Sequence, residues 1–348
     1  MIAVVFADIL LAGVILLIFA FFHHVLPAMI NNQDREQVVM QEQTLPTEQT
    51  VATVPSEPAP TDAPAVQTEP PAVQTEPDNR TEWQIKFADQ FSEKLQLSGN
   101  SYKSDEVSVT IETVTVGEGK SQVTYHVADI YIASMDNFTT YTANNEMRYF
   151  GTQDVLKMDA AANAIISISG DFLTYQKNGF LMRNREIYKN NTNVASICVL
   201  YEDGVMETYD GGTYSIDEVM DRGAVQVWSF GPVLLENGKV REHYNCSATV
   251  SQINPRSAIG YYEPGHYCFV VVDGRQEGYS IGMKIPELAA VFEELGCTSA
   301  YNLDGGGSAV MVYENQRYSS QSNGGDRGLG DILVIRESEF ANKEEGIG

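Results

Sequence analysis

The first clear pattern along the chain is an almost unbroken apolar run from Ile2 to Phe22, in which Asp8 is the only charged residue. A helix needs about 20 apolar residues to cross a hydrocarbon core of about 30 Å. No basic segment precedes the run and no small-x-small cleavage site follows it, which argues against a cleaved signal peptide. We therefore predict an uncleaved transmembrane signal-anchor over residues 1–30.

Residues 31–79 have a different pattern, rich in Pro, Thr, Glu and Gln and with almost no aromatic residues. The heptapeptide Pro-Ala-Val-Gln-Thr-Glu-Pro occurs at Pro64 to Pro70 and again at Pro71 to Pro77. Such a segment buries too little apolar surface to offset the entropy lost on ordering, and its prolines favour an extended chain. We predict a disordered linker that holds an extracytoplasmic domain away from the cell membrane.

Regular periodicities begin near residue 80. Apolar residues recur at every fourth position between Trp83 and Leu97, a spacing that predicts an amphipathic helix. Apolar and polar residues alternate from Val107 to Val116 and again from Gln122 to Ala133, which predicts a β-hairpin. Residues 80–150 are therefore expected to form the N-terminal helix and hairpin part of the domain.

The pattern over residues 151–337 consists mainly of short apolar runs separated by turn residues. Helical spacing is found at a few places, including Ile216 to Asp221 and Pro286 to Leu295. Because the strands follow one another with few helices between them, a doubly wound parallel sheet is not expected. We predict a single strand-rich α+β domain with a few helices, followed by a charged tail at residues 338–348.

Charge and cysteine content argue against some classes of function. The chain has 348 residues and a formal net charge of -25, which excludes nucleic acid as a partner because such binding depends on Lys and Arg. A local arginine cluster can still bind an anionic substrate, since salt screens charges beyond about 8 Å. The four cysteines include no Cys-x-x-Cys pair, which argues against a zinc site and leaves a disulfide open.

The most informative segment is Tyr301 to Ser308, where an aspartate precedes three consecutive glycines. Glycine loses more backbone entropy on folding than any other residue, so three in a row indicate that the backbone itself is needed. The glycine amides could form an anion-binding concavity, while the alternative is a turn that the aspartate merely caps. The candidate site residues here are Asp304, Gly305, Gly306, Gly307 and Ser308.

Further segments carry polar residues in specific strings. An arginine fork suits a phosphodiester because it donates two parallel hydrogen bonds to phosphate oxygens. Four of these residues also have a simpler interpretation. Asp171 could belong to a Gly-Asp turn, Gly231 to a rigid strand exit, Arg256 to a salt bridge and His266 to a hydrogen-bonded scaffold. The candidates from these segments are Asp171, Arg183, Asn184, Gly231, Arg256, His266 and Arg327.

Together these strings resemble the phosphodiester glycosidase family, whose animal member removes N-acetylglucosamine from a sugar-1-phosphate diester. Bacterial relatives are often labelled exopolysaccharide-biosynthesis proteins. The resemblance rests on Asn-Leu-Asp-Gly-Gly-Gly-Ser, Ile-Ser-Gly-Asp, Ser-Phe-Gly-Pro and Pro-Arg-Ser-Ala-Ile-Gly, which occur in the family's order between about Ser167 and Ile335. Ser169, Leu173 and Arg185 stand where the family usually has asparagine, an aromatic residue and glycine.

The resemblance implies a hydrolase that cleaves the glycosidic bond of a sugar-1-phosphodiester. Together with the predicted anchor, it leads us to expect a membrane-anchored enzyme that acts on a cell-surface glycan. It implies catalytic roles for Asp304, Asp171 and Arg256, with the glycine loop and the other candidates binding substrate or phosphate. Spacing does not decide which aspartate acts as nucleophile or base. The alternative is a membrane-tethered module that binds phosphoglycan without cleaving it.

No cofactor is expected from these patterns. No loop has the spacing of calcium ligands, although aspartates beside glycines leave Ca²⁺ or a similar cation open. The expected partners are a phosphate-linked glycan as substrate and the membrane, through the N-terminal helix.

Overall fold

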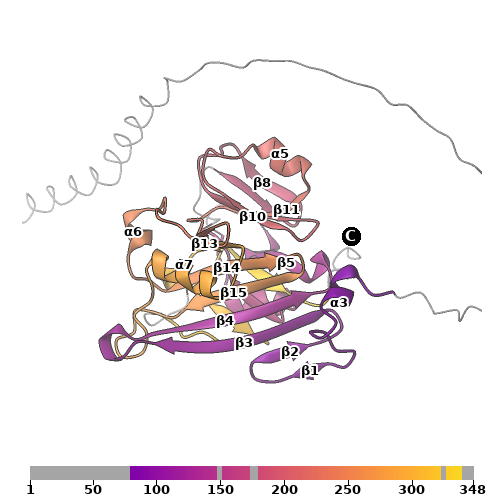
Figure 1. Ribbon diagram of the computed structural model, residues 1–348, viewed down its shortest axis with the longest axis horizontal. Helices are drawn as coiled ribbons and strands as arrows, with labels where there is room; N and C mark the ends of the chain where they lie inside the picture. Colours follow the sequence, from indigo (N-terminus) through magenta and orange to yellow (C-terminus); the bar gives the residue numbers. More distant parts are fainter. Residues whose placement is uncertain (1–78, 147–150, 173–178, 323–326, 339–348) are drawn as a thin grey trace, which may run out of the picture. The chain divides into compact units, whose positions relative to one another are not determined.

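The computed structural model describes residues 79–146, 151–172, 179–322 and 327–338. These residues form antiparallel sheets with a few short helices, which confirms the predicted strand-rich α+β class (Figure 1). The predicted anchor, nearly all of the linker and nearly all of the charged tail lie outside the described residues. Within the described ranges, no helix is long and apolar enough to cross a membrane.

The largest sheet in this part of the chain has its strands in the order β1, β2, β3, β4, β15, β14, β16. Its centre is the predicted hairpin, in which Val107 pairs with Ile132 and Val116 with Val123. β15 pairs with β4, so the hairpin and the later motif segments share one sheet. The bounds are β1 Gln96–Leu97, β2 Ser101–Lys103, β3 Val107–Val116, β4 Val123–Ile132, β14 Arg256–Glu263, β15 His266–Val272 and β16 Ser299–Asn302.

Two further sheets of five strands complete the framework. One runs β10 Met206–Tyr209, β9 Ile197–Tyr201, β11 Ala224–Trp228, β7 Phe180–Arg183 and β8 Glu186–Asn190. The other runs β18 Gln316–Arg317, β17 Met311–Tyr313, β6 Ile166–Ser169, β19 Asp331–Ile335 and β5 Phe138–Thr142. A separate hairpin joins β12 Leu235–Glu236 to β13 Lys239–Val240.

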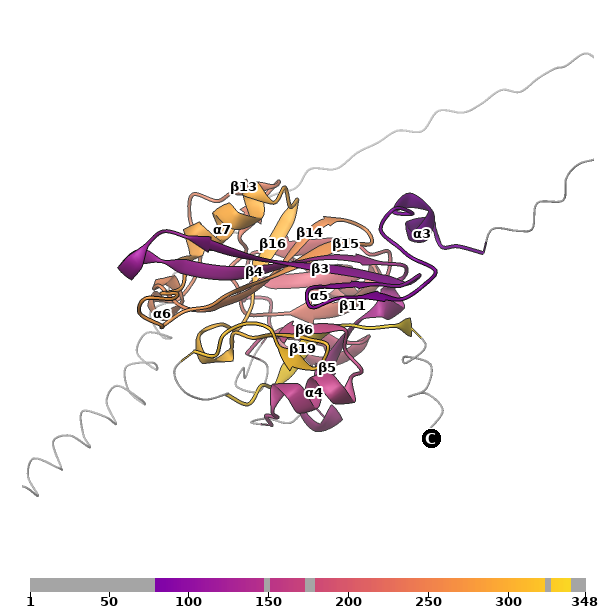
Figure 2. The ribbon, with the colours of Figure 1, turned by 90° about the horizontal axis from the view of Figure 1, so that it is seen from below.

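The main hydrophobic core lies between the seven-stranded sheet and the two smaller sheets, where the inward side chains of all three meet. Each sheet buries its other face under one helix: α7 Ile285–Glu294, α5 Ile216–Asp221 or α4 Val155–Ala161. Figure 2 shows α7 and α4 on opposite sides of the stacked sheets. The remaining short helices are α3 Glu82–Lys86, α6 Ala248–Ser251, η2 Gly119–Ser121, η3 Met135–Asn137, η4 Ala143–Asn145 and η5 Gly306–Ser308.

The predicted helix over Trp83 to Leu97 is wrong beyond its first turn. α3 has a capping box at Thr81 but ends at Lys86. The later apolar residues of the period do not share a buried face, since Leu95 is 60% exposed. The short helix instead packs its tryptophan, Trp83, against Gly265, where an added Cβ would lie 2.9 Å from the indole. A four-residue period without a common surface to bury does not sustain a helix.

β6 is the element that assembles the candidate site. It pairs with β17 on one side and with β19 on the other, with Ile168 opposite both Met311 and Leu333. The segment after β6, the connection before β17 and the start of β19 therefore meet at one end of this sheet. Asp171 and Asp331 lie at that end.

Candidate active site

Asp304 is fixed by its backbone to the end of β6. Its amide donates to the carbonyl of Gly170 at 2.9 Å, and its carbonyl accepts the Ser169 hydroxyl at 3.0 Å. Its carboxylate accepts hydrogen bonds from the Ser308 hydroxyl and the Gly305 amide. Ser169, which stands where the family usually has asparagine, therefore holds the backbone of Asp304 in place.

The glycines after Asp304 allow the loop to pass close to the chain before β14. A Cβ on Gly305 would lie 2.6 Å from the carbonyl oxygen of Pro255, and the Gly306 amide donates to that same oxygen at 2.9 Å. Gly306 has a φ of 62°, which glycine adopts without strain. The amides of Gly305 and Gly306 are thus bonded within the protein, and the anion-binding role of the glycine loop stays a prediction. A Cβ on Gly307 would meet open space.

Asp171 is buried after β6, where its carboxylate is bound on one side. Its Oδ2 accepts the Ser229 amide at 2.8 Å and lies 2.9 Å from Nη2 of Arg183. Nε of Arg183 donates to Oδ2 of Asp331 at 2.8 Å, so one guanidinium bridges two carboxylates. All three side chains are 0% exposed. Arg183 is therefore enclosed between two aspartates, and its role in substrate binding stays a prediction.

Burial controls the protonation of this acidic cluster. It raises the pKa of Asp304 to about 6, against the opposing effects of the Ser308 hydrogen bond and the Arg327 charge. It also raises the pKa of Asp331, while pairing with Arg183 opposes that rise. Asp304 can therefore change its protonation state near neutral pH, as a general acid or base must.

Arg327 lies beside the aspartates, and its role in binding phosphate stays a prediction. It lines a narrow crevice together with Asp171, Asp304 and Asp331. Its guanidinium carbon lies 5.5 Å from the centre of the Phe172 ring, within the range of a cation–π contact. Arg327 is thus the arginine of the predicted set whose charge acts on the carboxylate of Asp304.

A larger pocket of about 390 Å³ adjoins this crevice, and Phe172 lines both. Gly231 lies on its wall with a φ of 80°, and a Cβ there would lie 2.3 Å from the Ser196 hydroxyl. Close approach of the chain thus requires glycine at this position. The lining residues are Phe172, Val194, Ala195, Ser196, Phe230, Gly231, Asn245, Cys246, Ser247 and Val250.

Arg256 is not among the residues that line the crevice and the pocket, and its catalytic role stays a prediction. The side chain is buried and donates to three backbone carbonyls: Met283 at 2.9 Å, Val250 at 2.7 Å and Gln252 at 2.5 Å. Burial lowers its pKa to about 10. Since Val250 lines the large pocket, Arg256 acts on the site by holding part of the pocket wall.

Asn184 is also placed away from the crevice, at the turn between β7 and β8. It and Arg185 have φ values of 51° and 68°, as the two central residues of a type I′ turn do. Its side chain binds the backbone of Thr140, donating to the carbonyl at 2.8 Å and accepting from the amide at 3.1 Å. The substrate-binding role of Asn184 stays a prediction. Arg185 has a positive φ, the conformation that favours the glycine usual in the family. Leu173 lies outside the described residues.

His266 lies at the start of β15 in an aromatic stack. Its ring is 4.0 Å from the ring of Tyr131 and 4.0 Å from that of Tyr262, and its Nε2 is 2.7 Å from Oδ1 of Asp129. None of these residues lines the crevice or the adjoining pocket. The substrate-binding role of His266 stays a prediction.

The prediction missed Asp331 and the pocket aromatics. The signal for Asp331 was present, because Gly330-Asp331 at the start of β19 repeats the Gly170-Asp171 pair after β6. Tyr301 gave no such signal, although its hydroxyl donates to the Ser196 carbonyl at 2.7 Å and helps to hold the pocket wall. Among the described residues, no group of three or more His, Cys, Asp or Glu is arranged to hold a metal ion.

A family model described as phosphodiester glycosidase matches residues 162–336. The chain therefore belongs to the phosphodiester glycosidase family, and this membership supports a hydrolase-like function. The match contains the whole of the candidate active site. It leaves the hairpin of β3 and β4 outside the matched segment.

Individual relatives are distant. A Bacillus subtilis (strain 168) SPbeta prophage-derived uncharacterized protein is 29% identical over 218 residues, which are 58% of this chain and 33% of that protein. The chain thus spans about a third of the length of this relative. The catalytic domain of zebrafish N-acetylglucosamine-1-phosphodiester alpha-N-acetylglucosaminidase, auto-inhibited by its pro-peptide, has a TM-score of 0.54 and 19% identity, covering 70% of this chain and 88% of that one. A hypothetical protein from Synechocystis has a TM-score of 0.50 and 13% identity, and the match covers 67% of this chain and 63% of that one. These structures share the fold.

Proposed function

We propose that the protein is a membrane-anchored phosphodiester glycosidase that hydrolyses the bond between a sugar and phosphate in a cell-surface glycan. The observation that carries this proposal is the meeting of Asp171, Asp304 and Arg327 at one crevice beside a pocket of about 390 Å³. Membership of the family supports the same reaction class. The zebrafish protein of similar fold is named for cleavage of an N-acetylglucosamine phosphodiester.

The leaving group determines what the site must supply. Phosphate leaves readily, so the main requirements are neutralising its charge and stabilising a sugar with oxocarbenium character. Arg327 is the cation placed for the first requirement, because its charge already acts on Asp304. The carboxylates of Asp171 and Asp304 provide the negative charge for the second.

The two aspartates differ in environment, which supports different roles. Asp171 is held rigidly by Arg183 and Ser229, as suits a carboxylate that stabilises developing positive charge. Asp304 is partly exposed in the crevice and has a pKa of about 6, as suits a group that transfers a proton to or from water or the leaving phosphate. We therefore assign general acid–base catalysis to Asp304 and electrostatic stabilisation to Asp171.

The N-terminal pattern supports an extracytoplasmic location for this reaction. An anchor at residues 1–30 and a polar linker at 31–79 would place the domain within reach of glycans outside the membrane. The two described departures from the family pattern do not favour the non-catalytic alternative. Ser169 binds the backbone of Asp304, and Arg185 forms a regular turn.

The test is Asp304→Asn, with Asp221→Asn on an exposed helix end as the matched control. We expect Asp304→Asn to fold, as judged by circular dichroism, and to release no measurable sugar from a UDP-sugar that the unmodified protein hydrolyses. The control should retain full activity. A folded and active Asp304→Asn protein would remove Asp304 from the catalytic residues.

A further inference from the structure

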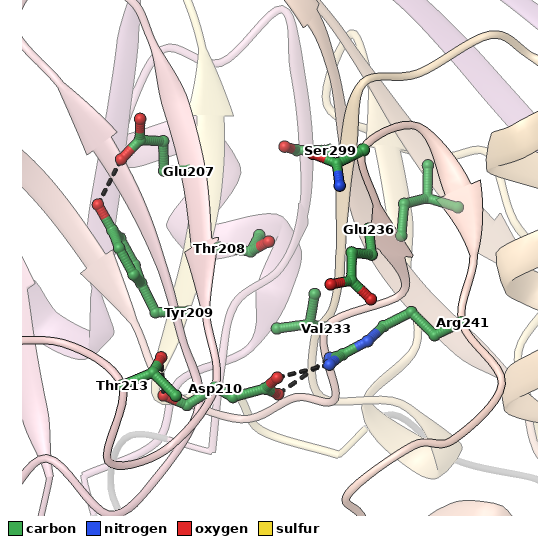
Figure 3. A pocket seen from close by; sticks show the side chains of 11 residues that line it. Glu207, Thr208, Tyr209, Asp210, Thr213, Val233, Glu236, Arg241 and Ser299 are labelled. Atoms are coloured by element: carbon green, nitrogen blue, oxygen red, sulfur yellow. Dashed lines mark hydrogen bonds and ion pairs between the residues drawn. The ribbon is translucent and has the colours of Figure 1, made fainter.

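A second polar cleft lies outside the candidate active site, between the end of β10 and the β12–β13 hairpin (Figure 3). We call it the β10–β12 cleft, and its volume is about 330 Å³, which is in the range of small-molecule sites. Its lining residues are Glu207, Thr208, Tyr209, Asp210, Thr213, Val233, Leu235, Glu236, Asn237, Arg241 and Ser299.

An ion pair across the cleft fixes its shape. Arg241 donates from Nη1 to Oδ1 of Asp210 at 2.9 Å and from Nη2 to Oδ2 at 2.5 Å. Figure 3 shows the two side chains pointing toward each other from opposite walls. A bidentate guanidinium–carboxylate pair holds both groups in one plane. Polar groups positioned in this way can bind a ligand without first losing much conformational entropy.

The chemistry of the lining favours an uncharged polyhydroxylated ligand. Hydroxyl and amide groups come from Thr208, Thr213, Asn237 and Ser299, and they can both donate and accept hydrogen bonds. The charged lining groups are three carboxylates and one guanidinium, and that guanidinium is already paired with Asp210, so the lining does not favour a phosphate group. Sugar hydroxyls can donate to the carboxylates. In the described part of the chain these acidic groups form no cluster suited to a metal ion.

The cleft is continuous in structure with the pocket of the candidate active site, because the same segments form walls of both. Gly231 lines the pocket and Val233 lines the cleft, and two residues of extended chain span at most about 7 Å. Arg241 lines the cleft at the start of the segment whose residues Asn245 to Ser247 line the pocket. The cleft and the pocket therefore lie close together along these segments.

The opposite wall of the cleft is also joined to a wall of the pocket. The Gly212 amide donates to the Asn193 carbonyl at 2.7 Å, and the Tyr214 hydroxyl donates to the Ala195 carbonyl at 3.1 Å. These bonds join the loop that carries Thr213 in the cleft to the segment that lines the pocket at Ala195.

From these observations we propose that the β10–β12 cleft is a second saccharide site, which binds an uncharged sugar unit of a glycan whose phosphodiester lies in the pocket. The link between the two sites rests on the proposed function, whereas sugar binding in the cleft does not. The protein thus distinguishes a polymeric substrate from a small one by a contact remote from the reacting bond. Such a contact lowers KM for the longer substrate.

The experiment measures binding and turnover separately. Thr208→Trp fills the cleft, and Glu236→Gln removes an exposed carboxylate from its rim without a change in volume. Glu242→Gln, an exposed glutamate next to Arg241 that does not line the cleft, is the matched control. Isothermal titration of the full chain uses uncharged cello-, malto- and chito-oligosaccharides, with inorganic phosphate and Ca²⁺ as the competing ligand classes.

We expect at least one oligosaccharide series to bind, and its affinity to fall about tenfold in Thr208→Trp and in Glu236→Gln, equivalent to about 1.4 kcal/mol. Binding by Glu242→Gln should be unchanged. With substrate, the same two variants should raise KM for a phosphate-linked oligosaccharide and leave KM for a UDP-sugar unchanged.

Two results would overturn the proposal: no binding of any oligosaccharide, or binding that both cleft variants retain in full. Binding of phosphate or Ca²⁺ in place of sugars would overturn it as well. Sugar binding that the cleft variants weaken, without turnover of any phosphodiester, would leave the saccharide site standing. That result would contradict the proposed function alone.

Discussion

Replacing Arg183 by methionine tests whether this arginine is a buried structural cation, as its contacts indicate. The guanidinium bridges Asp171 and Asp331 and also donates to the carbonyl of Met182 at 2.9 Å. All three charged side chains are 0% exposed, so the change leaves two buried carboxylates without their counter-charge. Breaking a buried ion pair in this way costs about 3–5 kcal/mol. That is a large part of the roughly 5–15 kcal/mol that stabilises a folded domain.

The assay is the free energy of unfolding from urea denaturation at pH 8 and pH 5. Without Arg183 the carboxyl of Asp331 loses the charge that opposes its raised pKa. A carboxyl whose folded pKa lies above its unfolded value destabilises the fold above the folded pKa, and the effect disappears at low pH. The deficit of Arg183→Met should therefore be larger at pH 8 than at pH 5.

A compensating variant and a control variant test whether Arg183 is structural. Asp331→Asn in the Arg183→Met background removes one uncompensated charge and should restore part of the lost stability at pH 8. Arg185→Met, in the exposed turn two residues away, should change stability by less than about 0.5 kcal/mol. A loss under about 1 kcal/mol for Arg183→Met, accompanied by a raised KM, would show that Arg183 faces the substrate.

Three further outcomes follow from the site. Asp304→Asn should stabilise the protein by about 1–3 kcal/mol at pH 7.5 and not at pH 4, because the folded pKa of the Asp304 carboxyl, about 6, exceeds its unfolded value of about 3.9. Thermal melts at both pH values measure this effect, and a loss of stability at both would contradict it. Arg256→Lys should raise KM several-fold with little change in kcat, because an ammonium does not reproduce the three hydrogen bonds that hold the pocket wall. A selective fall in kcat would instead support a catalytic role for Arg256. His266→Gln should leave kcat/KM within about twofold, and a larger loss would place the aromatic stack in the site.

Local patterns were enough to predict several of the elements. The β3–β4 hairpin alternates over both strands, α5 has the predicted bounds, and α7 has an apolar stripe beginning at a proline. Each of these elements buries a continuous face against a sheet, so the period in the sequence matches a surface in the structure. The period between Trp83 and Leu97 has no such surface, and the helix there ends early.

The candidate site was only partly predictable. The glycine string identified Asp304, and Gly170-Asp171 identified its neighbour. The roles of Arg183 and Arg256 depend on burial, which an arginine in a polar motif does not reveal. Arg183 is enclosed because β7 pairs with β11, while Asp331 reaches it from β19 in another sheet. Such contacts join residues 148 positions apart, so no local pattern contains them.

The measurement that tests the central claim most directly compares a UDP-sugar with the 4-nitrophenyl glycoside of the same sugar, scoring free sugar released by the protein. We expect release from the UDP-sugar, loss of that release in Asp304→Asn, and little or no release from the aryl glycoside. Intact UDP-sugars across several sugars, despite measurable binding, would contradict it and favour a membrane-tethered binding module.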